Sequence, residues 1–132
     1  MYLILLGLPG AGKGTQAARL TKTTGLAHIT TGELFRESIR LATELGKKAQ
    51  PYVDQGLLVP DDLTIRMLLE RISQPDCAQG WLLDGFPRSL EQARALDDAL
   101  ARRSEAIDRV VYIKASTDEL VRRLAGRWTC PQ

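Results

Sequence analysis

The feature that most constrains this chain is a glycine-rich segment near its start, Gly7-Leu8-Pro9-Gly10-Ala11-Gly12-Lys13-Gly14-Thr15. It follows an unbroken apolar run over Tyr2–Leu6 and precedes a helix-like stretch. The start of a helix leaves backbone N–H groups unpaired and carries partial positive charge. Glycines allow the backbone to wrap closely around a phosphate. The order of apolar strand, glycine-rich turn, lysine and helix therefore predicts a phosphate-binding loop.

The spacing within this segment supports the prediction, with one departure. Gly7-x4-Gly12-Lys13 fits a loop for a nucleoside triphosphate, in which Lys13 is a mobile cation for the outer phosphates. Gly14 stands where Ser or Thr is usual, and the hydroxyl comes one position later, at Thr15. A plain turn between a buried strand and a helix would explain the glycines, but not the agreement of all these elements in order.

The composition is that of an ordinary globular domain. A chain of 132 residues, 44% apolar and 26% charged, is large enough for one domain with its own core. The net charge of +2 is too small to indicate binding to nucleic acid or to a membrane surface. The apolar run over Tyr2–Leu6 is too short for a signal-peptide core or a membrane span. We therefore expect a cytoplasmic protein, with neither nucleic acid nor membrane as a partner.

The cysteines do not suggest a metal centre. Cys77 and Cys130 are too few and too far apart for a disulfide framework. A structural zinc site needs about four ligands, usually with Cys-x2-Cys spacing. We therefore expect that this chain cannot form a complete zinc site.

Apolar runs alternate with helical patterns along the chain. The predicted strands are Tyr2–Leu6, 27–29, Trp81–Asp84 and 110–113. The predicted helices are Lys13–Thr24, 30–45, 47–54, one after Asp61 or Asp62 with an apolar stripe from Ile65 to Ile72, 89–103, and one over 120–125 that follows a cap at Ser116. Gly46 is expected to end the second helix, and Asp61 or Asp62 to cap the fourth. The pairs at capping-box spacing are Thr30 with Glu33, Ser89 with Gln92, and Ser116 with Glu119.

This alternation predicts an α/β fold, a three-layer arrangement in which helices cover both faces of a parallel sheet. Ligands of such sheets bind where the strands end. Gly7, Asp84 and Lys114 each follow or end a predicted strand. We therefore expect them on one side of the molecule.

Two charged residues, Asp84 and Arg88, are expected on that side of the molecule. Asp84 ends an apolar strand and suits a magnesium ion held directly or through water, although a cap or turn role would also explain it. In Asp84-Gly85-Phe86-Pro87-Arg88, the Arg88 fork would project from a rigid turn and could grip a phosphate.

The remaining candidates are less specific. Arg123 and Arg127 flank the apolar stripe of the last predicted helix and could reach into a cleft, but a solvated basic face is an equal explanation. Leu120, Val121 and Leu124 form that stripe, which is expected to be buried. For the single histidine, His28, we expect a structural role rather than that of a catalytic base.

The motifs together resemble the adenylate kinases, which are nucleoside monophosphate kinases of the P-loop class. The likeness rests on Gly-x-Pro-Gly-x-Gly-Lys-Gly-Thr-Gln and Asp-Gly-Phe-Pro-Arg, and extends to Thr30-Thr31-Gly32, Leu57-Leu58-Val59 and Gly126-Arg127. It implies a single P-loop kinase core over residues 1–132. Within it, residues 30–59 would be the mobile insert over the nucleoside monophosphate, and residues 123–132 would begin the lid over ATP.

The resemblance also implies an activity, the direct in-line transfer of the γ-phosphoryl group of MgATP to AMP to give two ADP. The residues implied for ATP are Gly10, Ala11, Gly12, Lys13, Gly14, Thr15, Arg123 and Arg127. Those implied for AMP are Thr31, Arg36, Leu57, Leu58, Val59, Gly85, Phe86, Arg88 and Gln92. The implied catalytic residues are Lys13, Arg88, Arg123 and Arg127, and Asp84 would hold Mg²⁺ through water.

The resemblance bears on the choice of acceptor as well. Thr31 and Gln92 would favour adenine, because relatives selective for UMP or CMP tend to lack both. Gln92 has two competing roles, because adenine binding and the capping pair with Ser89 would use the same side-chain amide. A cis peptide bond is expected before Pro87.

The end of the chain departs from the family pattern. Cys130-Pro131-Gln132 falls where the lid begins, so the rest of the lid, the last strand and the last helix would be missing. Residues 110–113 would then be a bare apolar sheet edge. We expect a monomer at full length, a dimer or aggregate for this chain alone, and weak AMP binding with poor turnover. Two alternatives stay open: a nucleotide-binding module without turnover, and a P-loop kinase for another small acceptor.

Overall fold

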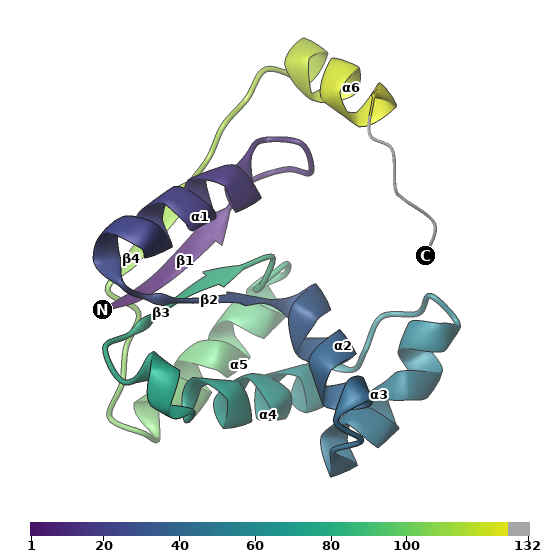
Figure 1. The fold of residues 1–132 in the computed structure, drawn as a ribbon, viewed down its shortest axis with the longest axis vertical. Coiled ribbons are helices and arrows are strands. Elements are labelled where there is room, and N and C mark those ends of the chain that lie inside the picture. Colours follow the sequence, from purple (N-terminus) through teal and green to yellow (C-terminus); the bar gives the residue numbers. More distant parts are fainter. Residues whose placement is uncertain (127–132) are drawn as a thin grey trace.

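The computed structural model describes residues 1–126, which fold around a parallel sheet (Figure 1). The strands are β1 (Tyr2–Leu6), β2 (Ala27–Thr30), β3 (Trp81–Asp84) and β4 (Arg109–Tyr112). Their order across the sheet is β2-β3-β1-β4, and every pairing is parallel. The phosphate-loop strand β1 is therefore central, because it pairs with both β3 and β4.

Helices cover both faces of the sheet, as the sequence predicts. The helices are α1 (Lys13–Thr24), α2 (Thr31–Arg40), α3 (Glu44–Asp54), α4 (Asp61–Ile72), α5 (Leu90–Ala101) and α6 (Thr117–Ala125), with a 3₁₀ turn at Pro75–Cys77. In Figure 1, α1 lies over one face and α4 and α5 lie over the other. The predicted three-layer α/β fold is confirmed.

Alternation along the strands explains the two layers of core. Leu3 and Leu5 of β1 pack with Ala17 of α1 in one apolar cluster, whereas Ile4 belongs to the larger cluster on the opposite face. Successive side chains of a strand point to opposite faces, so both faces of β1 need apolar residues. The continuous apolar run in the sequence follows from this double burial.

The three predicted helix starts are confirmed by side-chain caps. The hydroxyls of Thr30, Ser89 and Ser116 accept hydrogen bonds from the N–H groups three residues later, at 3.1, 3.2 and 3.3 Å. Each cap satisfies a backbone donor that the first helical turn leaves unpaired. These caps fix where α2, α5 and α6 begin.

Two local expectations are wrong. Gly46 does not end a helix: α2 ends at Arg40, and Thr43 caps α3, within which Gly46 is buried. A Cβ on Gly46 would lie 2.1 Å from the Ser38 carbonyl oxygen, so this glycine serves the close packing of α3 on α2. The N-cap of α4 is Pro60, and Asp61 and Asp62 are helical residues of the first turn.

The periphery near the described end also differs from expectation. In α6, Leu120 is buried, but Val121 and Leu124 are 61% and 43% exposed. Figure 1 shows the reason, because α6 stands beyond α1 and does not lie on the sheet. All four residues of β4 are exposed, and no strand of the described part pairs with its outer edge, as expected for residues 110–113.

Among residues 1–126, no helix is long and apolar enough to span a bilayer.

Candidate functional site

The phosphate loop joins β1 to α1 at the edge of the sheet where the strands end. Gly12 is the N-cap of α1 and has φ of 93°, a left-handed conformation that residues with a Cβ rarely adopt. No side chain caps this helix, and its first turn carries no acidic residue. Its free N–H groups therefore keep their partial positive charge, which suits a phosphate. Lys13 Nζ donates to the Leu8 carbonyl oxygen at 3.2 Å, across the loop.

Helix α6 lies against this loop. Arg123 Nη1 donates to the Gly10 carbonyl oxygen at 3.1 Å, and Arg123 Nε donates to Glu119 Oε1 at 2.6 Å. Arg122 is paired with the other oxygen of Glu119 and is 77% exposed, so it points to solvent as expected. Of the two explanations for Arg123, the structure therefore favours reach toward the loop. Arg127 lies outside the described residues.

Asp84 ends β3 beside the loop, because it pairs with Leu5 of β1. Its side chain is 11% exposed, and its Oδ2 lies 3.6 Å from His28 Nε2. That nitrogen is buried and has no hydrogen-bond partner among residues 1–126. A largely buried carboxylate at a strand end suits Mg²⁺, which keeps several waters and takes other ligands from nucleotide phosphates. Asp84 therefore has the chemistry and the position to hold the ion through water, and that role stays a prediction.

A second set of polar residues gathers around Gly85, directly after β3. The point where a Cβ would stand on Gly85 is 3.5 Å from Thr31 Oγ1 and 3.7 Å from Arg88 Nη2. The equivalent point on Gly32 is 3.1 Å from Arg36 Nη1. Arg88 is held in place, since its Nε donates to the Gly85 carbonyl oxygen at 2.8 Å. Arg88 and the Thr31 hydroxyl therefore lie at Gly85, while the Arg36 guanidinium lies beside Gly32, the residue after Thr31. A guanidinium held at a strand end suits the phosphate of a second ligand.

The same turn contains the expected cis bond, between Phe86 and Pro87. Phe86 is 2% exposed and packs in the hydrophobic core, so its side chain anchors the turn to the core. Val59 is also buried, at 9% exposed, whereas Leu57 and Leu58 are 56% and 83% exposed. Of the three predicted apolar AMP residues, only Val59 is part of the core, and the other two face outward.

Gln92 uses both ends of its side-chain amide. Its Oε1 accepts from the Arg88 backbone N–H at 2.6 Å, and its Nε2 donates to Asp61 Oδ1 at 2.7 Å. In a full capping box, the Gln92 side chain would accept a hydrogen bond from the Ser89 backbone N–H. Here it accepts from the Arg88 backbone N–H instead. Sequence reasoning did not single out Asp61 as a partner, because no local pattern links residues 31 positions apart.

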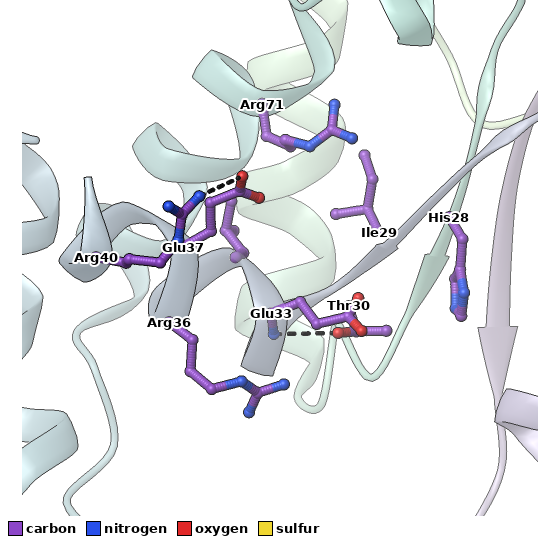
Figure 2. A pocket seen from close by; sticks show the side chains of 9 residues that line it. His28, Ile29, Thr30, Glu33, Arg36, Glu37, Arg40 and Arg71 are labelled. Atoms are coloured by element: carbon purple, nitrogen blue, oxygen red, sulfur yellow. Dashed lines mark hydrogen bonds and ion pairs between the residues drawn. The ribbon is translucent and has the colours of Figure 1, made fainter.

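Two hollows lie outside these clusters. One, of about 430 Å³, lies between β2, α2 and the end of α4 and is lined by His28, Glu33, Arg36, Arg40 and Arg71 among others; Figure 2 shows Arg36 directed away from the Glu37–Arg40 pair. The other, of about 680 Å³, lies between α3 and α4 and includes Leu57, Tyr52 and Arg66. Neither of these two hollows is lined by the phosphate loop or Arg88, although Arg36 lines the first and Leu57 the second.

A third polar cluster supports the end of α4 and was not predicted. Arg71 donates to both carboxylate oxygens of Asp76, at 2.9 and 2.7 Å, and to Cys77 Sγ at 3.1 Å. Hydrogen bonding from Arg71 lowers the pKa of Asp76. Burial raises the pKa of the Cys77 thiol. A thiol with a raised pKa is a weak nucleophile, so this cluster is structural.

The fold and the loop define a class, the P-loop nucleotide-binding proteins, in which a parallel sheet ends in a phosphate loop opening a helix. The family model described as "Adenylate kinase" matches residues 5–128. The chain belongs to the adenylate kinase family.

Individual relatives agree with this family. The chain is 53% identical over 131 residues to an adenylate kinase of Finegoldia magna, covering 99% of this chain and 61% of that protein. It is 52% identical over 132 residues to an adenylate kinase of Carboxydothermus hydrogenoformans, covering 100% and 62%. The chain thus spans about three fifths of the length of the curated relatives it matches.

Proposed function

We propose that this chain supplies the nucleotide-binding core of a nucleoside monophosphate kinase that transfers the γ-phosphoryl group of MgATP to AMP, giving two ADP. The observation that supports the proposal is that the phosphate loop and the Arg88 turn both lie at the edge of the sheet where β1 and β3 end. The phosphate loop suits the donor, and Arg88 at Gly85, with Arg36 at Gly32, suits an acceptor phosphate.

The residues at each cluster have distinct roles in the proposal. The N–H groups at the start of α1 and Lys13 hold the ATP phosphates, joined by Gly10, Ala11, Gly14 and Thr15. Arg123 is released from the Gly10 carbonyl oxygen to reach the transferring phosphates, together with Arg127. Arg36 and Arg88 hold the AMP phosphate, with Thr31, Gln92 and the segment 57–59 near the base. Magnesium, held through water by Asp84, would neutralise charge between the outer phosphates.

The transfer needs no covalent enzyme intermediate. An AMP phosphate oxygen attacks the γ-phosphorus, a new P–O bond forms, and the bond to the β–γ bridging oxygen breaks. ADP leaves with that electron pair, and no oxidant or further reactant is required. The positive groups stabilise the charge that spreads over the equatorial oxygens, while positioning brings the two oxygens into line.

Residues 30–59, which contain α2 and α3, are assigned as the part that moves over the acceptor. Residues from 123 onward are assigned as the beginning of the part that covers ATP. Closure of both parts would exclude water from the transferring group.

The test is direct observation of transfer by this chain. We would incubate it with ATP, Mg²⁺ and AMP, and follow ADP by ³¹P NMR, with AMP replaced by UMP in a parallel sample. ADP that forms with AMP, more slowly with UMP, and not with the Lys13→Met variant supports the proposal. Binding of both nucleotides without ADP would contradict transfer by this chain and leave it a nucleotide-binding module. Equal rates with another small acceptor would contradict AMP as the substrate.

A further inference from the structure

We propose that Asp61 is a specificity-determining residue: it fixes the orientation of the Gln92 amide so that the acceptor site selects adenine over 6-oxopurines. The inference rests on the proposed function, since it concerns the base of the acceptor. Asp61 opens α4, directly after residues 30–59, and Gln92 lies in the first turn of α5. The two side chains meet across 31 positions of sequence, at 2.7 Å.

The two partners of Gln92 leave its amide only one orientation. The Arg88 backbone N–H can only donate, so the group facing it at 2.6 Å must be the oxygen. The Asp61 carboxylate can only accept, so the group facing it must be the NH₂. Turning the amide over would place donor against donor and acceptor against acceptor. Both hydrogen bonds would then be lost, and one of them involves a charged partner.

The fixed amide still has bonding capacity for a ligand. A carbonyl oxygen can accept a second hydrogen bond and an NH₂ group can donate a second one, and the inference assigns to the ligand the acceptor and the N–H that an amide presents together along its O–C–N edge. Adenine offers a matching edge, because its 6-amino group donates and its neighbouring ring nitrogen accepts. Hypoxanthine and guanine have the reverse order, with an accepting 6-oxo group beside a donating N1–H. For a base held in one pose by its phosphate, the amide orientation decides which order fits.

The Asp61 side chain has no other hydrogen bond or ion pair among residues 1–126, and it is exposed at the start of a helix. A simple tie between α4 and α5 would also explain the contact. The two explanations differ in what the Asp61→Asn variant does. The introduced asparagine has nearly the same shape as aspartate but can either donate or accept, so the Asp61 end no longer opposes a reversed Gln92 amide and only the Arg88 N–H still does. A purely structural tie would weaken the fold without changing which base is preferred.

The chain offers a matched control one position away. Asp62 also lies in the first turn of α4 and is exposed, and it makes no hydrogen bond or ion pair within the described residues. The Asp62→Asn variant therefore removes the same charge from the same helix start without touching Gln92. Any effect of charge on the helix or on the ligand phosphate appears in both variants.

The experiment measures AMP and IMP binding to both variants and to the unchanged chain by calorimetry. The two ligands differ only at the purine 6-position and N1. We expect Asp61→Asn to lower the ratio of AMP to IMP affinity by about tenfold or more, as loss of a charge-assisted hydrogen bond predicts, and Asp62→Asn to leave it unchanged. An unchanged ratio in Asp61→Asn, with normal AMP binding by the unchanged chain, overturns this inference and leaves the proposed function standing.

A measurement without ligand separates the two proposals further. The side-chain NH₂ signals of Gln92 in a ¹H–¹⁵N spectrum should shift in Asp61→Asn and not in Asp62→Asn. If they shift but the unchanged chain binds no AMP, the proposed acceptor is wrong and the selectivity inference falls with it. If they do not shift, the inference is wrong whatever the chain binds.

Discussion

Replacing Gly46 with alanine should destabilise the fold through a clash between α3 and α2. The added Cβ would lie 2.1 Å from the carbonyl oxygen and 2.4 Å from the carbonyl carbon of Ser38, and 2.8 Å from the Ile39 nitrogen. Normal contacts of a Cβ are about 3.4 Å or more, so α3 must move by more than about 1 Å. These neighbours are backbone atoms, which cannot turn aside as a long side chain can.

The expected cost follows from two opposing effects. Overpacking of this kind costs about 1–3 kcal/mol or more, while alanine in place of a helical glycine returns about 0.5–1 kcal/mol. We expect a net loss of about 2 kcal/mol in the free energy of unfolding. With a urea dependence of about 2 kcal/mol per molar, the midpoint should fall by about 1 M.

Gly14 provides the matched control for this measurement. It is also a helical glycine near a helix start, but a Cβ there meets no atom within 4 Å. Gly14→Ala should leave the urea midpoint unchanged or raise it slightly, because only the helix propensity changes. A Gly46→Ala midpoint equal to or above that of the unchanged chain would refute the packing argument.

Two further predictions concern acid and the sheet edge. Because Arg71 lowers the Asp76 pKa, this carboxyl adds stability above its unfolded pKa of about 3.9 and loses it as pH falls through the lower folded value. The difference in unfolding free energy between the unchanged chain and Asp76→Asn should therefore shrink below about pH 4; a difference constant down to about pH 2 would contradict this. At β4, Val110 and Tyr112 are 56% and 61% exposed. Val110→Lys should reduce concentration-dependent association in sedimentation, since a charged edge discourages strand pairing, and unchanged association would exclude this edge as its cause.

Local chemistry explains what the sequence could predict. The strand β1, the phosphate loop and the caps at Thr30, Ser89 and Ser116 each follow from residues within a few positions of one another. A hydroxyl three residues before a backbone N–H can cap a helix, and a glycine-rich turn between a strand and a helix can bind phosphate. Both predictions need only neighbouring residues. The order of these elements was enough to predict the parallel sheet.

Tertiary contacts explain what the sequence could not predict. Gly46 has the local signature of a helix end, but the packing of α3 on Ser38 decides its role. Asp61 has the local signature of a helix cap, yet its partner is Gln92 of another helix. The exposure of Val121 and Leu124 depends on where α6 stands relative to the sheet, which helical periodicity does not encode.

The most direct test of the central claim, that a second phosphate site is built around Gly85, is AMP binding to the Arg88→Lys variant by calorimetry. Lysine keeps the charge but lacks the planar fork that grips a phosphate with two bonds. Arg66→Lys is the control, since Arg66 lies on α4 and lines the hollow between α3 and α4. The account predicts about tenfold weaker AMP binding or more in Arg88→Lys and no change in Arg66→Lys. Equal AMP affinity in Arg88→Lys and the unchanged chain would contradict it.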